Sequence, residues 1–270
     1  MPIADERARG VLLGLAAGDR IGGPIRMALR VAESLRACGR FDADDIGRRY
    51  LAWYRDGAFD TGPTAGRVLE LVDEGLSFRE AAERVDAESG GLTAGCNPAH
   101  RAASLALSPT IDDAELADCA RAEAALTHRH PLAGDAAAAV VVLCRALVRG
   151  TDWCDALALA SEGRLTETAR ALDPERSSDP GKGGFAPEAL GAAVHFVDRA
   201  DAFSAALDRA LAFAGSANYC PVLVGSLGGA RWGATAVDPA RLEVHRRLVP
   251  EIEATAQALA RSWASENGAG

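Results

Sequence analysis

Five short segments of the sequence combine glycine or proline with side chains that could do chemistry. They span residues 10–24, 53–64, 95–101, 126–131 and 214–233, and they contribute carboxylate, hydroxyl, amide and imidazole groups. Free backbone N–H groups at the start of a helix favour an anion such as a pyrophosphate. The third and fourth segments therefore predict anion binding. The second segment supplies Asp60, a carboxylate suited to charge stabilisation or general-base chemistry.

Two of these segments also have simpler structural explanations. Asp60 precedes a Gly-Pro turn, so it can instead cap the helix that begins near Pro63 or Thr64. His128 and His130 stand two residues apart, and for this pair alone solvated loop positions are the favoured interpretation.

The first segment places glycine at every fourth position, at Gly10, Gly14 and Gly18, and then continues with Asp19. Small residues at this spacing let another helix approach closely, and helix packing followed by a turn is the favoured interpretation of the segment alone. A phosphate-binding loop needs a preceding strand and a Gly-Lys-Ser/Thr ending. A Walker-type nucleotide site is therefore excluded.

The elements that must position these segments are predicted to be helices. Ala, Leu and Arg dominate, whereas aromatic residues make up 5% of the sequence. Between residues 202 and 213 apolar side chains recur at steps of three and four, and Gly215 supplies a stop. Ser77 and Asp112 are each followed three residues later by glutamate, the pattern of a capping box. No segment sustains a period of two, so we predict an all-α fold.

Gly/Pro-rich connections separate the helices at residues 57–63, 90–98 and 173–187, the last being the longest expected loop. Long connections in a helical domain often carry function, so these loops are candidate site segments. No shift in composition resembles an interdomain linker. We therefore expect a single domain over residues 1–270.

Charge, hydropathy and cysteine spacing exclude several classes of function. The formal net charge is −9 and no basic stripe is present, so we expect no nucleic-acid partner. No apolar run approaches membrane-spanning length and the N-terminus lacks a signal-peptide pattern, which predicts a cytoplasmic protein without a membrane partner. The six cysteines form neither a C-x-x-C pair nor a zinc pattern, so most are expected to be small buried apolar residues.

In their order and spacing, these segments resemble the ADP-ribosylglycohydrolase family, also called the DraG-like hydrolases. The similarity rests on the glycine-rich first segment, Asn97 to Arg101, Thr127-His128, Gly183-Gly184-Phe185 and the glycines from Gly225 to Gly233. It covers most of the chain, from about Gly10 to Gly233. Each motif is weak alone, and their order in an Ala-rich helical chain makes the combined match specific.

The resemblance implies a compact, orthogonal all-α bundle that hydrolyses the N- or O-glycosidic bond at the anomeric carbon of ADP-ribose. In the family, paired Mg²⁺ ions assist this reaction, and such ions need several carboxylate and hydroxyl oxygens. A T-D-D-T-like block and a late G-G-D-x-D-T/S block supply those oxygens in the family.

This sequence departs from both metal-binding blocks. The early block keeps Asp60 but has Phe59 at the other carboxylate position. The late block has Ser216 and Asn218 at its two carboxylate positions and Tyr219 at the hydroxyl position. One acid remains of four, so we predict that the dinuclear Mg²⁺ site is absent and that no cofactor is required. A single loosely held Mg²⁺ at Asp60 stays an open alternative.

The sequence therefore predicts a hydrolase that cleaves a ribose N-glycosidic bond in an ADP-ribosyl or related pyridine nucleotide-like substrate without the metal pair. Departure of a pyridinium needs only a stabilised oxocarbenium-like centre and a positioned water. Asp60 is the candidate catalytic residue. The expected substrate-binding residues are Arg26, Thr61, Cys96, Asn97, Arg101, His128, Gly183, Gly184, Phe185, Ser216, Asn218 and Tyr219.

In this hypothesis the polar residues between 216 and 219 hold the ribose hydroxyls. Residues 96–97 and 183–185 cradle phosphate and ribose, with Arg101 or His128 orienting that loop. Arg26, which stands near the position of a family glutamate, or Lys182 would pair with a terminal phosphate.

The alternative hypothesis is a catalytically inactive relative that binds ADP-ribose or a protein partner, with Asp60 left over as a helix cap. An active enzyme could take either an ADP-ribosylated protein or a small molecule made from a pyridine nucleotide. An Asp60→Asn variant separates activity from binding alone.

Overall fold

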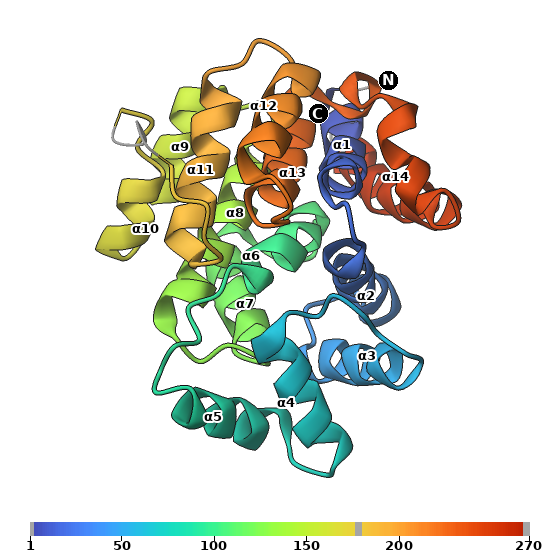
Figure 1. The fold of residues 1–270 in the computed structure, drawn as a ribbon. Helices are drawn as coiled ribbons and strands as arrows, with labels where there is room; N and C mark the ends of the chain where they lie inside the picture. Colours follow the sequence, from blue (N-terminus) through green and yellow to red (C-terminus); the bar gives the residue numbers. More distant parts are fainter. Residues whose placement is uncertain (1–2, 176–179, 267–270) are drawn as a thin grey trace.

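The computed structural model describes residues 3–175 and 180–266. Its α-helices are α1 (Ile3–Gly18), α2 (Gly23–Cys38), α3 (Ala43–Arg55), α4 (Pro63–Asp73), α5 (Phe78–Glu88), α6 (Asn97–Arg101), α7 (Asp113–Ala124), α8 (Pro131–Val148), α9 (Trp153–Ser161), α10 (Thr166–Ala171), α11 (Ala186–Asp198), α12 (Phe203–Ala214), α13 (Cys220–Trp232) and α14 (Val249–Glu266). Short 3₁₀ helices are η1 (Ala102–Leu107), η2 (Ala234–Ala236) and η3 (Pro239–His245). Within the described ranges, extended backbone forms only an isolated bridge between Gly95 and Phe185. The all-α prediction is confirmed (Figure 1).

Helices α1 and α13 lie side by side because their facing positions lack side chains (Figure 1). A Cβ atom on Gly14 would lie 2.1 Å from the carbonyl oxygen of Gly225, and one on Gly10 would lie 2.2 Å from that of Gly229. The glycine repeat of the first segment is therefore a helix-packing motif. Its consequence for the site is that the end of α1, at Asp19, lies beside the loop that leads into α13.

Helix α8 forms the centre of the core and packs against α7, α9, α6 and α13. Contrary to the sequence-based expectation, its 18 residues are long and apolar enough to cross a membrane. However, 89% of this span is buried inside the protein, as expected for the core helix of a globular bundle.

Local signals predicted some helix ends correctly. Ser77 and Glu80 form the reciprocal capping box at the start of α5, and α12 ends at Gly215 with φ of 61°. The second predicted capping box is wrong, because Asp112 precedes α7 without making a side-chain capping hydrogen bond. All six cysteines are free thiols, and burial is confirmed for three of them, Cys96, Cys144 and Cys220, rather than for most of the six.

Three of the loops that the sequence singled out converge at one end of α6 (Figure 1). The loop before α6 pairs with the loop before α11, since the Cys96 N–H donates to the Gly184 carbonyl at 2.9 Å and the Ala186 N–H to the Ala94 carbonyl at 2.8 Å. Residues 176–179 of the predicted 173–187 loop lie outside the described residues. The pairing fixes both loops against each other and shapes the cavity described next.

Candidate functional site

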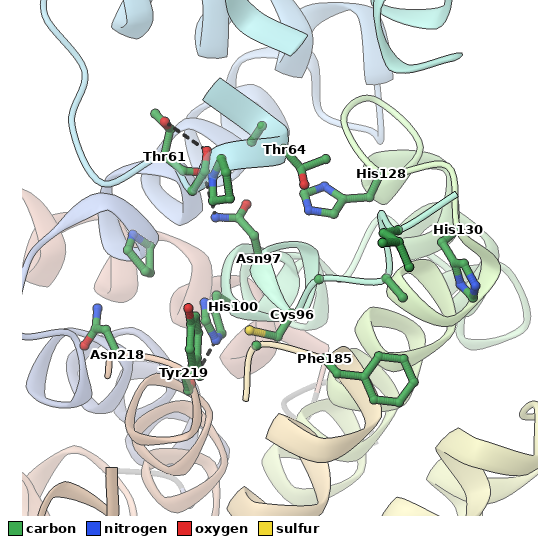
Figure 2. A pocket seen from close by; sticks show the side chains of 18 of the residues that line it. Thr61, Thr64, Cys96, Asn97, His100, His128, His130, Phe185, Asn218 and Tyr219 are labelled. Carbon is green, nitrogen blue, oxygen red and sulfur yellow. Dashed lines mark hydrogen bonds between the residues drawn. The ribbon is translucent and has the colours of Figure 1, made fainter. Parts of the chain in front are cut away.

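A cavity of about 460 Å³ opens where these loops meet the starts of α4, α6 and α13. Nine of the thirteen predicted site residues line it, namely Asp60, Thr61, Cys96, Asn97, His128, Gly184, Phe185, Asn218 and Tyr219. Figure 2 shows Asn97 and His100 close together, with Phe185 on the opposite side of the site from Thr61. Residues from five distant parts of the chain thus share one concave site.

The other four predicted contacts do not line this cavity. Arg101 is completely buried beneath it, so it cannot touch a ligand there. Gly183 and Ser216 are exposed neighbours of the lining residues. Arg26 lies on the other side of the first turn of α2, in a separate small cavity. These four expectations of direct contact in the main cavity are corrected by the fold.

Asp60 lies at the edge of the cavity with φ of 53°, a left-handed conformation that residues other than glycine seldom adopt. Its Oδ2 accepts the N–H of Gly23 at 3.3 Å, which places the carboxylate at the N-terminus of α2. Burial raises the pKa of Asp60, the Gly23 hydrogen bond partly lowers it, and the nearby Asp19 charge raises it further. The proposed cap of the next helix is wrong, because α4 follows Gly62 without a side-chain cap.

Asp19 is a second carboxylate at this end of the fold, and its hydrogen bonds are all internal. Its Oδ1 accepts N–H groups from Ile21 at 3.1 Å and Gly22 at 2.8 Å, and its Oδ2 accepts that of Ile25 at 3.0 Å. The Asn218 side-chain amide also donates to Oδ1, at 2.9 Å. Asp19 therefore holds the α1–α2 turn. Its position directly after the glycine repeat was the sequence signal for this role.

Asn218 connects the turn at Asp19 to the loop before α13. Its Nδ2 donates to Asp19, and its Oδ1 accepts the Arg20 N–H at 3.2 Å. The Arg20 guanidinium in turn donates to the carbonyls of Gly215 and Ala217. A neutral amide suits this place, because it donates a hydrogen bond to a buried carboxylate that a second carboxylate would repel.

These residues do not fit a pair of Mg²⁺ ions. Asp19 accepts four N–H hydrogen bonds, Asn218 is neutral, and Asp60 offers one carboxylate. Among the residues that the structure describes, no three His, Cys, Asp or Glu side chains are grouped closely enough to hold a metal ion. Dehydrating two Mg²⁺ ions requires more negative oxygen ligands than this site provides.

Arg101 holds the floor of the cavity from below. Its Nε donates to Glu123 Oε1 at 2.6 Å, and its Nη1 donates to Asn97 Oδ1 at 2.6 Å. Tyr50 donates its hydroxyl to the same Glu123 oxygen at 2.7 Å. Asn97 then donates from Nδ2 to the Thr61 carbonyl at 3.1 Å (Figure 2). A buried ion pair thus orients Asn97, and Asn97 fixes the loop that carries Asp60.

Two histidines of the site are neutral hydrogen-bonding groups. Arg101 Nη2 donates to the Thr127 hydroxyl at 2.8 Å, and the same hydroxyl is hydrogen-bonded to His128 Nδ1 at 2.7 Å. When the hydroxyl donates to Nδ1, the neutral His128 ring carries its proton on Nε2. Burial lowers the pKa of His128 well below its usual value, and the charge of Arg101 lowers it further. His100 bonds the Tyr219 carbonyl through Nε2 at 2.9 Å, and burial lowers the pKa of this histidine to about 4.

The mouth of the cavity is apolar. Phe185 and Tyr219 are 39% and 42% exposed, and Leu92 on the opposite loop is 84% exposed. Exposed rings of this kind suit the face of a planar base or pyridine. Sequence reasoning missed Leu92 and His100, because nothing in the sequence shows that their loops face the same space.

Comparisons with known proteins agree with this geometry. The sequence model of the ADP-ribosylglycohydrolase family matches residues 25–268. The chain is 26% identical to the ADP-ribosyl-[dinitrogen reductase] glycohydrolase of Rhodospirillum rubrum, over 86% of this chain and 87% of that protein. A solved structure described as an ADP-ribosylglycohydrolase-related protein complex superposes with a TM-score of 0.79 at 27% identity, covering 97% of this chain and 99% of the other. The chain belongs to the ADP-ribosylglycohydrolase family.

Proposed function

We propose that this chain hydrolyses a ribose N-glycosidic bond in an ADP-ribosyl or related pyridine nucleotide-like substrate without a pair of metal ions. Family membership supports the ADP-ribosyl class of substrate. The observation that carries the reaction is Asp60, which among the described residues is the one acidic side chain lining the cavity.

In the proposed reaction, a water oxygen bonds to the anomeric carbon while the ribose C–N bond breaks. The electron pair of that bond stays on the ring nitrogen, so a pyridinium leaves as a neutral pyridine. Positive charge spreads over the anomeric carbon and the ring oxygen, and the Asp60 carboxylate stabilises it. The water loses a proton to Asp60, which passes it to solvent. Gly23 holds Oδ2 of this carboxylate, which leaves Oδ1 for the sugar or the water.

The start of α4 is the best-placed site for substrate phosphate. Thr64 and Ala65 line the cavity in the first turn of this 11-residue helix, where N–H groups have no partner within the helix. The Nε2–H of His128 supplies a further neutral donor. The Cys96 N–H, expected to cradle phosphate, is already bonded to the Gly184 carbonyl at 2.9 Å. The exposed rings of Phe185 and Tyr219 are placed to flank a planar base.

The test is a panel of NAD, nicotinamide mononucleotide, nicotinamide riboside and ADP-ribosyl-arginine, each incubated with Mg²⁺ or with EDTA and followed by mass spectrometry. We expect base release in EDTA that Asp60→Asn abolishes. Thr110→Val, on the loop before α7 and outside the cavity, is the matched control and should react like the unmodified protein. Release only in the presence of Mg²⁺ would overturn the proposal.

A catalytically silent ADP-ribose binder is the second candidate, and one observation favours it. The Asp60 carboxylate already accepts the Gly23 N–H, so it has a structural role at the start of α2 without any substrate. Under this alternative, ADP-ribose binds in calorimetry to the unmodified protein and to Asp60→Asn alike, and no substrate of the panel is cleaved.

A further inference from the structure

A second cavity, of about 180 Å³, lies beside the first turn of α2 and is basic. Its walls include Arg26, His245, Arg246 and Arg247, and Glu243 is the acidic side chain among its described lining residues. We call it the basic cavity. A concentration of three guanidinium groups stands out in a chain whose formal net charge is −9.

The backbone of two consecutive residues at the start of α2 lies between the basic cavity and Asp60, because Gly22 faces the cavity and Gly23 faces Asp60. A Cβ atom on Gly22 would lie 2.3 Å from Arg26 Nη1 and 3.3 Å from the His245 ring. A Cβ atom on the next residue, Gly23, would lie 2.0 Å from the Asp60 carbonyl oxygen. Because consecutive Cα atoms are about 3.8 Å apart, the Arg26 guanidinium lies on the order of 10 Å from Asp60. The two glycines permit this close approach on both sides of the turn.

Arg26 is held in place on the wall of the basic cavity. Its Nη1 donates to the Gly22 carbonyl at 2.9 Å, and its guanidinium lies over the Phe59 ring, 4.6 Å from the centroid. Phe59 is 44% exposed and directly precedes Asp60. The opposite wall is fixed as well, because buried His245 bonds the Asp19 carbonyl through Nε2.

The positive charge of the basic cavity is only partly balanced by the protein. Glu243 lies 3.4 Å from Arg246. Asp19 and Glu251, the latter paired with Arg30 at 2.9 Å, act on the Arg26 charge from beyond ion-pair distance. Within the described part of the chain, no carboxylate forms an ion pair with Arg26 or Arg247. The remaining guanidinium N–H groups are therefore available to a carboxylate of a ligand.

We propose that the basic cavity binds a carboxylate carried by the leaving group, so that the substrate is the N-riboside of an acidic ring such as a pyridine carboxylate. This inference rests on the proposed function, since it places the anomeric carbon at Asp60 and the leaving ring beside the exposed Phe59 ring, one face of which the Arg26 guanidinium covers. The nucleotide phosphate lies in the main cavity, at α4. A volume of about 180 Å³ matches one small acidic group rather than a second nucleotide.

Nicotinic acid mononucleotide and nicotinamide mononucleotide test the inference, because they differ only in carboxylate against carboxamide. We expect the unmodified protein to prefer the acid by about tenfold or more in kcat/KM, because the carboxylate makes a charge-assisted hydrogen bond in the basic cavity that the carboxamide cannot make. Arg247→Gln, at an exposed position, and Arg26→Gln should each reduce this acid-to-amide ratio to within about threefold of unity. Arg79→Gln, an exposed arginine on α5, is the control and should keep the ratio. Equal kcat/KM values for the two compounds in the unmodified protein would overturn the inference.

Calorimetric binding of the two compounds to Asp60→Asn separates failure of this inference from failure of the proposed function. Tighter binding of the acid, lost in Arg247→Gln, supports the basic cavity even if neither compound is cleaved. Equal affinities for acid and amide overturn the inference even if both compounds are cleaved. A purely structural role for Arg26 or Arg247 would not change the ratio between two ligands that differ in one charged group.

Discussion

Replacing Asn218 by aspartate would restore one carboxylate of the family metal block and set it against Asp19. The Asn218 amide nitrogen lies 2.9 Å from Asp19 Oδ1, and the two side chains are 8% and 1% exposed. Asn218→Asp therefore removes a hydrogen bond to a buried charge and adds a like charge at the same distance. We expect this variant to be much less stable in the absence of a divalent cation.

Two quantities limit the loss of stability in Asn218→Asp, namely the repulsion between the two carboxylates and the cost of protonating one of them. Two unit charges at this distance repel by roughly 6 kcal/mol at an effective dielectric constant of 20. Protonating one carboxyl group instead costs about 4 kcal/mol at pH 7, given an ordinary pKa near 3.9. The expected loss in the free energy of unfolding is thus about 3 to 5 kcal/mol at pH 7. Repulsion raises the pKa of the new carboxyl in the folded state, so the loss grows as pH rises and disappears below about pH 4.

Urea unfolding at pH 7 and pH 5, with Mg²⁺ or EDTA, measures this effect. Asn218→Asp should recover stability at pH 5 and in Mg²⁺, whereas the unmodified protein should not respond to Mg²⁺. Ser216→Asp, at the other family carboxylate position but exposed, is the control and should change stability by less than about 0.5 kcal/mol. If Asn218→Asp is as stable as the unmodified protein in EDTA at pH 7, the described Asp19–Asn218 contact is refuted.

Three further predictions follow from other contacts. Gly14→Ala would place a methyl group 2.1 Å from the Gly225 carbonyl oxygen and should lower the free energy of unfolding, measured in urea melts, by about 2 to 4 kcal/mol. Gly134→Ala is the control and should be nearly neutral, because the nearest neighbour of its added Cβ lies at 3.4 Å. Equal free energies of unfolding for the two variants would contradict the α1–α13 packing. Arg101→Met leaves Glu123 buried without its cation and should lower the free energy of unfolding by about 3 to 5 kcal/mol. Adding Glu123→Leu should restore stability, and a double variant that stays unstable would show that loss of the ion pair is not the cause. Because the pKa of Asp60 is raised above the ordinary aspartate range, kcat/KM should fall as pH drops through that raised pKa. His100, with a pKa of about 4, and His128 stay neutral, so a rate step between pH 6 and 7 that His128→Gln removes would contradict the lowered pKa of His128.

The parts of the fold that depend on neighbouring residues could be predicted from the sequence. The apolar spacing of α12, its stop at Gly215 and the capping box at Ser77 are local patterns, and the structure has all three. The glycine repeat correctly indicated close helix packing. It could not identify α13 as the partner, because the two helices are far apart in the chain.

The site was less predictable, because its geometry depends on contacts between distant segments. Arg101 was expected among the substrate-binding residues, yet Glu123 and Thr127 draw it entirely beneath the cavity. The alternative role of Asp60 as a cap of the helix that follows it is wrong, because its carboxylate binds the N-terminus of α2, 37 residues earlier. Neither pairing has a signature in the spacing of the residues.

The central claim is that Asp60 acts without a metal pair, and the most direct measurement is the rate of base release from nicotinic acid mononucleotide across an Mg²⁺ titration that begins in EDTA. We predict a rate constant that is the same at all Mg²⁺ concentrations and that is lost in Asp60→Asn while the ligand still binds. A rate constant that is zero in EDTA and rises with Mg²⁺, or an Asp60→Asn variant that retains the full rate, would contradict the claim.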